Sequence, residues 1–424
     1  MRLTFCLLRD FLTREWNESE FIMNAIRVLV ALIGCFIYGL SITYVGGIEN
    51  ALSQQFGMSA SVMGSLNNLY LFGAVLGLLL CSSLLDGQYA HRVIVLLSFL
   101  LTLSFFLVGM PHNETFLMLG ELLMGCCAIS YMVYAIKLSN VYYPLLMHRL
   151  LPLVIGFVIL GNSGTSFVEE MTLYLGFIES NGIITVLLLC YSFILALTVK
   201  PFSAATDSDP KEGNQWVKQI FLVLEPLKSR SVTIITLSAA ISVGFVTVVF
   251  FNIVTPMIYV NTAYQGMTSM IYLLKAVFGL LIGLMFTEQL STNRSLTVQY
   301  GLICLCAWVI AFLFYHHADL FYVTASLALL AVLVSTNSAC SLRNITRNIA
   351  PSHSARIAGC FNLLYKTVVF IIGLPMGFIL PHQTIDRIDH RDLLGVAVYF
   401  VILSSVVFMI MSFLFFTKKG QQNK

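Results

Sequence analysis

Three ionisable side chains stand inside long apolar stretches of this chain, where a charge needs a polar partner. Glu121 lies in "GELLMG", Lys275 in "YLLKAVFGLLIG" and Lys366 in "NLLYKTVVF". An ionised group in apolar surroundings is costly unless it is paired, so each should face a counter-charge, water or a ligand. Two ammonium groups against one carboxylate leave a surplus positive charge, which favours a bound carboxylate or phosphate. An ion pair between Glu121 and one lysine is the alternative that the residues leave open.

Glu121 is the carboxylate placed deepest in such a stretch, and we predict that it binds a coupling proton. A carboxyl group holds its proton more tightly in apolar surroundings and less tightly beside a lysine, so a change of surroundings could load and release the proton. A structural carboxylate near the outer end of its helix is the alternative.

Uncharged polar residues in other apolar stretches could complete a binding site. Asn67 and Asn68 stand together in one stretch, and Asn252 precedes Pro256, which can break a helix. Such amides could hydrogen-bond a substrate or, alternatively, a neighbouring helix. The predicted substrate-binding residues are Lys275, Lys366, Asn252, Asn67 and Asn68.

The composition of the chain indicates which elements hold these residues. Of 424 residues, 58% are hydrophobic and 10% are charged, whereas about a quarter are charged in an ordinary soluble protein. Apolar stretches of about 20 residues, the length with which a helix crosses a bilayer, recur along the chain. They lack the alternating pattern of a barrel strand. We predict an all-α integral membrane protein with twelve transmembrane helices at 25–46, 60–84, 92–110, 115–138, 148–168, 181–199, 232–256, 264–286, 295–314, 319–341, 355–380 and 393–416.

A polar segment at residues 200–230 divides these spans six and six. It contains "SAATDSDPKEGNQ", a composition typical of a flexible linker. Most lysine and arginine residues fall near the span ends and in the loops on one side of the membrane, so the positive-inside rule places both termini in the cytoplasm. The predicted domains are a cytoplasmic N-terminal segment (1–24), a six-helix bundle (25–199), the cytoplasmic linker (200–230), a second six-helix bundle (231–416) and a cytoplasmic tail (417–424).

The two halves carry an internal repeat. "GSLNNLYLFGAVLGLLL" (64–80) aligns with "GMTSMIYLLKAVFGLLI" (266–282). Lys275 stands where the first half has Gly73, so a cation replaces a residue that permits close helix packing beside Gly77. Parallel repeats of six helices are typical of transporters with a central cavity between two bundles. Further aligned pairs are Tyr70 with Tyr272, Asp86 with Glu288, Arg92 with Arg294 and Arg149 with Arg356.

With these features the chain resembles the major facilitator superfamily over essentially its whole length. After the second predicted span, "SSLLDGQYAHR" is similar to the acidic and basic loop of that family and keeps Leu84, Asp86 and, with one residue of slippage, His91 and Arg92. It lacks the first glycine and the arginine after the aspartate. The resemblance implies two pseudo-symmetric bundles. It also implies that Asp86 and Arg92 form a conformational gate that stabilises the outward-facing state, with solvated loop charges as the alternative.

The resemblance further implies a secondary transporter that works by alternating access. We expect it to move a small anionic or zwitterionic solute, such as an amino acid, an organic acid or a phosphorylated metabolite, with protons as the coupling ion. An exporter of amphiphilic compounds and a transporter-like receptor that no longer transports are alternatives. A membrane-embedded enzyme is a further class, but no convincing set of nucleophile and base is apparent, so we expect no enzyme.

The expected partners are the substrate, protons and the lipid bilayer, and the expected state is a monomer. A formal net charge of +3 is too small to favour nucleic acid. No nucleotide-binding loop is present, and we expect no cofactor. The His and Asp residues of "YHHAD" (315–319) and "HQTIDRIDHRD" (382–392) lack a ligand spacing and are interpreted as solvated loops, so no metal is expected. Short loops and an N-terminus without a cleavable signal predict a multi-pass protein of a bacterial inner membrane.

Overall fold

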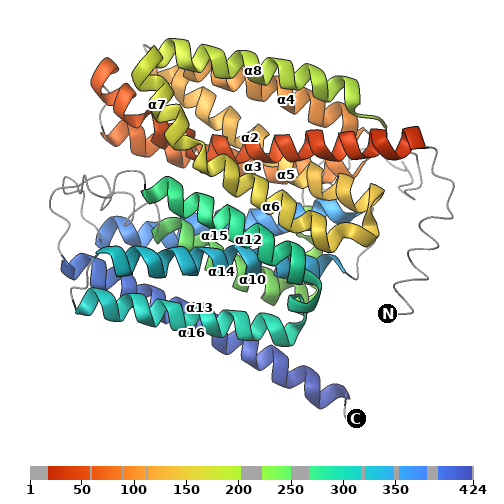
Figure 1. Ribbon diagram of the computed structural model, residues 1–424, viewed down its shortest axis with the longest axis vertical. Helices are drawn as coiled ribbons and strands as arrows, with labels where there is room; N and C mark the ends of the chain where they lie inside the picture. Colours follow the sequence, from red (N-terminus) through yellow and green to blue (C-terminus); the bar gives the residue numbers. More distant parts are fainter. Residues whose placement is uncertain are drawn as a thin grey trace.

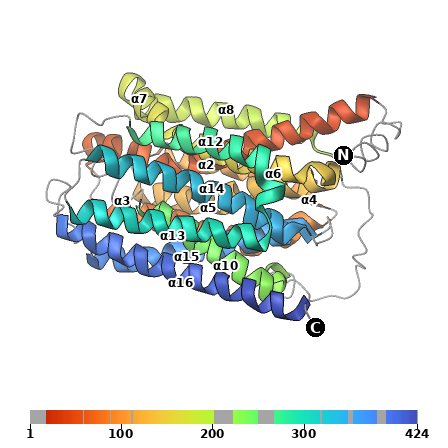
Figure 2. The same cartoon turned by 60° about the horizontal axis from the view of Figure 1, so that its bottom comes forward.

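The computed structural model describes residues 18–57, 60–87, 89–110, 113–201, 222–249, 267–316, 320–347, 353–379 and 390–422. Within these ranges all the regular elements are helices, as predicted. Most of them lie side by side along one common direction in Figure 1 and Figure 2. A helix satisfies its own backbone hydrogen bonds, and such an array is therefore suited to a bilayer.

The helices from the first part of the chain, red to yellow-green in Figure 1, occupy the upper side of that view. A contact between the Tyr143 hydroxyl and the Phe21 carbonyl, at 3.3 Å, joins the end of one helix to the start of another. The helices of the first part are α2 (Glu18–Phe56), α3 (Ala60–Asp86), α4 (Ala90–Val108), α5 (Glu114–Tyr142), the short 3-10 helix η1 (Pro144–Leu146), α6 (Met147–Ser163), α7 (Thr165–Leu175) and α8 (Phe177–Thr198).

The helices from the second part, green to blue, occupy the lower side of the same view. In both views α2 begins and α16 ends at the same end of the molecule. The predicted domain boundaries stay a prediction, and most of the predicted linker lies outside the described residues. The helices of the second part are the 3-10 helix η2 (Leu222–Lys228), α10 (Arg230–Val249), α12 (Met267–Leu290), α13 (Asn293–Tyr315), α14 (Leu320–Thr346), α15 (Ser354–Ile379) and α16 (His390–Gln422).

Local sequence explains where α5 begins. The Asn113 side chain accepts hydrogen bonds from the backbone N–H groups of Thr115 and Phe116, at 3.0 and 3.3 Å. Asparagine is a preferred residue at this position, since its oxygen satisfies amides that have no partner within the helix. Glu114 in the first turn adds a negative charge at the positive end of the helix dipole. The start of α5 fixes the depth of Glu121, two turns further along.

Eight helical segments in the described residues are long and apolar enough to cross a membrane. Three shorter apolar helices lie at Arg230–Gly244, Ala276–Leu290 and Ala397–Phe413. Large apolar side chains such as Leu197 and Tyr174, each 87% exposed, cover the outer faces, as expected of surfaces in contact with lipid. The chain is thus a multi-pass integral membrane protein. The count of twelve spans stays a prediction.

The helices α3 and α5 pack closely because glycine lines their contact. A Cβ atom added at Gly73 or Gly77 would overlap the backbone carbonyl of Leu122 or Cys126 on α5. Gly125 of α5 in turn meets the backbone of Tyr70 on α3. The sequence predicted close packing at Gly73 and Gly77, and the structure confirms it. This contact fixes Tyr70 and Glu121 on neighbouring helices.

Replacing Gly77 with alanine is expected to destabilise the protein by about 1 to 3 kcal/mol, the usual cost of overpacking. The added methyl group meets backbone atoms of Cys126, which cannot rotate away. Thermal unfolding of the purified protein in detergent measures the change. Gly182 on α8 is the matched control, because a Cβ atom there meets nothing within 4 Å. Its replacement by alanine should leave the unfolding temperature unchanged or raise it. Equal unfolding temperatures for the two variants would contradict the packing argument.

The most extensive contacts between the two parts of the chain are those of α3 with α15 and of α6 with α12. A Cβ atom at Gly359 of α15 would meet the Ser82 side chain of α3. Likewise a Cβ atom at Gly283 of α12 would meet Pro152 of α6. Small residues therefore allow close approach at both contacts. Lys366 lies two turns beyond Gly359 on α15, next to the first of these contacts.

Candidate functional site

Lys366 lies at the junction of the two halves and faces three tyrosine rings. Its side chain belongs to α15 and the residue is 2% exposed. The ammonium nitrogen lies 5.8 Å from the ring centroid of Tyr38 on α2, 5.6 Å from that of Tyr70 on α3 and 5.3 Å from that of Tyr365. Rings at such distances attract a cation through their negative faces. They supply no hydrogen-bond acceptor comparable to a carboxylate.

Among the residues that the structure describes, no carboxylate forms an ion pair with Lys366. Removing an ammonium group from water costs several kcal/mol even after the surroundings relax. Three rings near the limiting distance of about 6 Å return about 0.5 to 2 kcal/mol each. The arrangement therefore leaves an incompletely neutralised positive charge between the two halves.

Glu121 is fully buried on α5, in the first half of the chain. Neither of its carboxylate oxygens has a hydrogen-bond partner among the described residues. Tyr44 on α2 and Tyr70 on α3 are among the groups with which it interacts electrostatically. No ion pair joins Glu121 to Lys366 among the described residues. The alternative pairing of Glu121 with Lys275 stays open, because the Lys275 side chain lies outside the described residues.

The Tyr44 hydroxyl bonds Asn181 and not Glu121. The Tyr44 hydroxyl donates to the Asn181 side-chain oxygen on α8. Asn181 in turn donates to the backbone carbonyl of Phe105, at 2.8 Å. This buried chain of hydrogen bonds links α2, α4 and α8, and it occupies the hydrogen of the Tyr44 hydroxyl.

The remaining predicted substrate-binding residues are placed less completely. Lys275 lies in α12 and Asn67 in α3, but their side chains are outside the described set, as is the whole of Asn252. Asn68 is exposed on α3. The Tyr70 ring faces Lys366, and Tyr70 lies on α3, which packs against the helix α5 that carries Glu121. The roles of all these residues stay predictions.

Asp86 ends α3 in a buried cluster that crosses from one half to the other. Its carboxylate accepts hydrogen bonds from the backbone N–H groups of Ala355 and Arg356, at 3.1 and 2.9 Å, in the first turn of α15. Lys137 Nζ lies 3.5 Å and Arg356 Nε 3.4 Å from its oxygens. A carboxylate at a helix N-terminus is favoured by the helix dipole and by the free amides there.

The two residues of the predicted gate are not found together. Arg92 is exposed, and its guanidinium lies over the Tyr89 ring at 5.5 Å instead of pairing with Asp86. The basic partners of Asp86 are Lys137 and Arg356. A lysine near the end of a membrane helix can extend to the membrane surface, but Lys137 does not. Lys137 is 2% exposed and donates to the Leu85 carbonyl at 2.7 Å.

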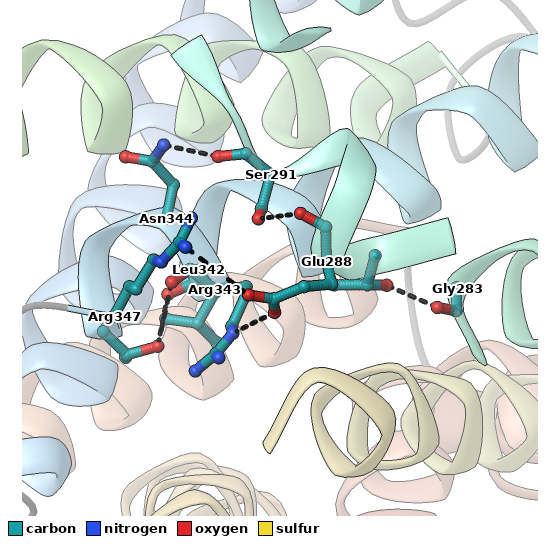
Figure 3. A network of polar contacts seen from close by, with 9 residues as sticks. Gly283, Glu288, Ser291, Leu342, Arg343, Asn344 and Arg347 are labelled. Carbon is teal, nitrogen blue, oxygen red and sulfur yellow. Dashed lines mark hydrogen bonds and ion pairs between the residues drawn. The ribbon is translucent and has the colours of Figure 1, made fainter. Parts of the chain in front are cut away.

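A second acidic cluster occupies the repeat position of Asp86, at the end of α12 (Figure 3). Glu288 Oε2 accepts from Arg343 Nε at 3.0 Å, and Arg347 lies 3.9 Å from its other oxygen. Both arginines belong to α14, in the same half as Glu288. Asn344, between them, donates to the Ser291 carbonyl and joins the same turn. The Glu288 cluster therefore fastens neighbours within one half, whereas Asp86 reaches across to the other half.

Two functional candidates were missed by sequence reasoning, and each left a signal. Tyr70, which covers Lys366, is one of the positions at which the two repeats are identical, with Tyr272. Arg356, which pairs with Asp86, matches Arg149 in the repeat. Identity between two degenerate repeats marks positions where both halves keep the same side chain, and these two residues could have been selected on that ground.

A multi-pass helical membrane protein with paired repeats, a cation at the junction of its halves and an acidic helix cap between them has the design of a two-bundle carrier. The family model of the Major Facilitator Superfamily matches residues 31–374. Since this covers most of the chain, the protein belongs to that superfamily, whose members are membrane transporters. The comparison with curated proteins gives no match.

Proposed function

We propose that this protein is a secondary active transporter that moves a small anionic or zwitterionic solute across the membrane by alternating access, coupled to protons. The observation that carries the proposal is Lys366. It is a buried ammonium group between the two halves, surrounded by tyrosine rings and without a carboxylate partner in the described chain. A substrate carboxylate or phosphate would supply the missing negative charge and hydrogen-bond acceptors.

The position of Lys366 explains how an anion could be carried rather than only bound. The lysine comes from α15, whereas Tyr38 and Tyr70 come from the other half of the chain. A solute held here touches both halves at once, so it can favour one of their relative arrangements over another through its contacts. Amino acids, organic acids and phosphorylated metabolites share the group that Lys366 would recognise.

Glu121 supports the coupling to protons. It is a fully buried carboxyl group whose oxygens have no donor in the described chain, and such a group is stable there only when it is neutral or when a donor approaches it. Protonation therefore suits the arrangement seen here. Loss of the proton would require a rearrangement of the neighbouring helices, which is how a proton can drive a conformational cycle.

Uptake into proteoliposomes tests the proposal. We expect an inwardly directed proton gradient to drive accumulation of one class among a neutral amino acid, a dicarboxylate and a sugar phosphate, with an uncharged sugar excluded. Binding of one class without uptake would favour the receptor instead. Uptake of bulky amphiphilic compounds alone would favour the exporter.

Replacing Glu121 with glutamine is expected to separate transport from proton coupling. Glutamine resembles the protonated acid, so the variant should exchange labelled for unlabelled substrate across the membrane but lose gradient-driven accumulation by at least about tenfold. Measuring exchange and accumulation in the same proteoliposomes checks this. Glu114 lies two turns earlier on α5 and is exposed, so Glu114→Gln is the matched control and should keep both activities. Full accumulation by the Glu121 variant would remove this residue from the coupling step.

A further inference from the structure

The short helix η2, which directly precedes α10, packs against both halves at the end of the molecule where α3 ends. Its Val223 side chain is fully buried. A Cβ atom added at Gly359 of α15 would lie 3.1 Å from Val223 and would also meet the Ser82 side chain of α3. Thr233 of α10 donates to the Leu227 carbonyl of η2 at 2.7 Å and fastens η2 to α10. η2 is therefore attached to the second half and reaches the first half at this junction.

Glu225 of η2 shares an arginine with Asp86. Glu225 Oε2 lies 3.6 Å from Arg356 Nη1, and Asp86 Oδ2 lies 3.4 Å from Arg356 Nε. Lys137 Nζ lies 3.5 Å from the other oxygen of Asp86. Glu225 also lies 3.7 Å from Lys228, but the Lys228 side chain is 82% exposed and such a pair contributes little. Negative and positive charges thus alternate across the junction in the order Lys137, Asp86, Arg356, Glu225.

This row of charges can divide into two neutral pairs, one on each half. Lys137 and Asp86 belong to α5 and α3 of the first half, whereas Arg356 and Glu225 belong to α15 and η2 of the second. Separation of the halves at this end breaks the contact between Asp86 and Arg356. Lys137 then still neutralises Asp86, and Glu225 still neutralises Arg356. Separation therefore avoids leaving a buried charge without a partner, which is strongly unfavourable.

We propose that Glu225 is a positioning residue for transport, which holds Arg356 after Asp86 withdraws and so allows the halves to open at this end. The inference rests on the proposed alternating-access cycle, but not on the nature of the substrate or of the coupling ion.

The proposal predicts which arrangement Glu225 favours. In the closed arrangement Arg356 has Asp86 as a partner, so loss of Glu225 leaves it with one carboxylate. In the open arrangement Glu225 is the partner that remains, so its loss leaves Arg356 with none. The two carboxylates also repel each other when both lie near one guanidinium, which further weakens the closed arrangement. Glu225 therefore stabilises the open arrangement more than the closed one.

Hydrogen exchange of the full-length protein in lipid, without substrate and without a proton gradient, tests this. The amides of Ala355 and Arg356 donate to Asp86, so exchange in the peptide covering residues 353–360 reports how often Asp86 withdraws. We expect Glu225→Gln to slow this exchange about threefold, the effect of a pair whose carboxylate side chain is 47% exposed. Asp86→Asn, which removes the closed contact itself, should accelerate the same exchange.

Two variants separate the charge of Glu225 from the packing of η2. Val223→Ala removes buried methyl groups next to Gly359 and should accelerate exchange, because it loosens η2 against the junction. A loosened η2 would make Glu225→Gln behave in the same way, so opposite signs distinguish the two causes. Glu20 is an exposed carboxylate near the start of α2, and Glu20→Gln is the matched control that should leave exchange unchanged.

A double-mutant cycle with Arg356 shows whether the arginine carries the effect. In the Arg356→Met background Glu225 has no arginine to hold, so adding Glu225→Gln should change exchange less than about 1.5-fold. An undiminished effect in this background overturns the inference, as does unchanged or faster exchange in Glu225→Gln alone.

Two other outcomes concern the proposed cycle. Unchanged exchange in Asp86→Asn would mean that the halves do not separate at Asp86, and the inference would fall together with alternating access at this end. The expected exchange pattern in a protein that moves no solute into proteoliposomes would overturn the proposed transport alone and support the role of Glu225 in the opening.

Discussion

Replacing Lys366 with methionine is expected to raise the KM for the transported anion at least about 30-fold, corresponding to the lower end of the 2 to 5 kcal/mol usually lost with a buried charged contact. Methionine keeps much of the length and apolar character of the side chain, so packing against the tyrosine rings is largely preserved. The variant lacks only the charge that would hold the substrate. Initial uptake rates over a range of substrate concentrations, in proteoliposomes, measure the effect.

The same variant separates a binding lysine from a structural one. Because Lys366 has no carboxylate partner in the described chain, removing its charge should leave the thermal stability of the substrate-free protein unchanged or raise it. A lysine paired for structural reasons would behave in the opposite way, since loss of one partner of a buried pair costs about 3 to 5 kcal/mol. Unchanged KM for every anion, together with lower stability, would contradict the substrate role. Lys200 is exposed after the end of α8, and Lys200→Met is the control that should change neither quantity.

The sequence predicted those parts of the structure that depend on local composition. Apolar length predicted helices, and the small residues Gly73 and Gly77 predicted the close contact of α3 with α5. The acidic loop predicted a role for Asp86 in a conformational gate, and the structure places Asp86 in a buried cluster. The gating role itself stays a prediction. In each case the physical cause lies within a few residues of the chain or in a pattern repeated along one helix.

The partners of these residues could not be predicted in the same way, because they depend on which helix faces which. Lys137 stands near a helix end, and a long lysine side chain can turn either to the membrane surface or to the interior. The side chain turns to the interior because Asp86 lies on the neighbouring helix, with its carboxylate 3.5 Å from Lys137 Nζ. Tyr38 and Tyr70 meet Lys366 from the other half of the chain, hundreds of residues away. The spacing of these residues along the sequence therefore cannot predict that they lie next to one another.

The contrast between Asp86 and Glu288 shows how a repeat can lose symmetry in function. Both residues lie in the last turn of the corresponding helix of their half, and both pair with arginine. Asp86 reaches the first turn of α15 in the other half, whereas the ion-pair partners of Glu288 both come from α14 in its own half. A contact between halves must break when they separate at this end, while a contact within one half can move as a unit. Asp86 is therefore the residue whose loss should alter the alternating-access equilibrium.

Replacing Asp86 with asparagine is expected to open this end of the molecule. The variant loses the charge that pairs with Lys137 and Arg356, although Arg356 keeps an ion pair with Glu225 at 3.6 Å. One of its two oxygens no longer accepts from the first turn of α15. Loss of one partner from a buried pair costs about 3 to 5 kcal/mol, but the Arg356 side chain is 21% exposed, so we expect about 2 kcal/mol after allowing for solvent screening.

Hydrogen exchange of the peptide covering residues 353–360 measures this opening, because the amides of Ala355 and Arg356 are those bonded to Asp86. Exchange there should accelerate at least about tenfold in Asp86→Asn, and uptake should fall, since the cycle spends less time closed at this end. Glu288→Gln is the matched control at the repeat position and should leave exchange in this peptide unchanged. If the two variants accelerate exchange equally, the cause is a general loosening of the fold. The cluster at Asp86 would then hold the fold together without gating it.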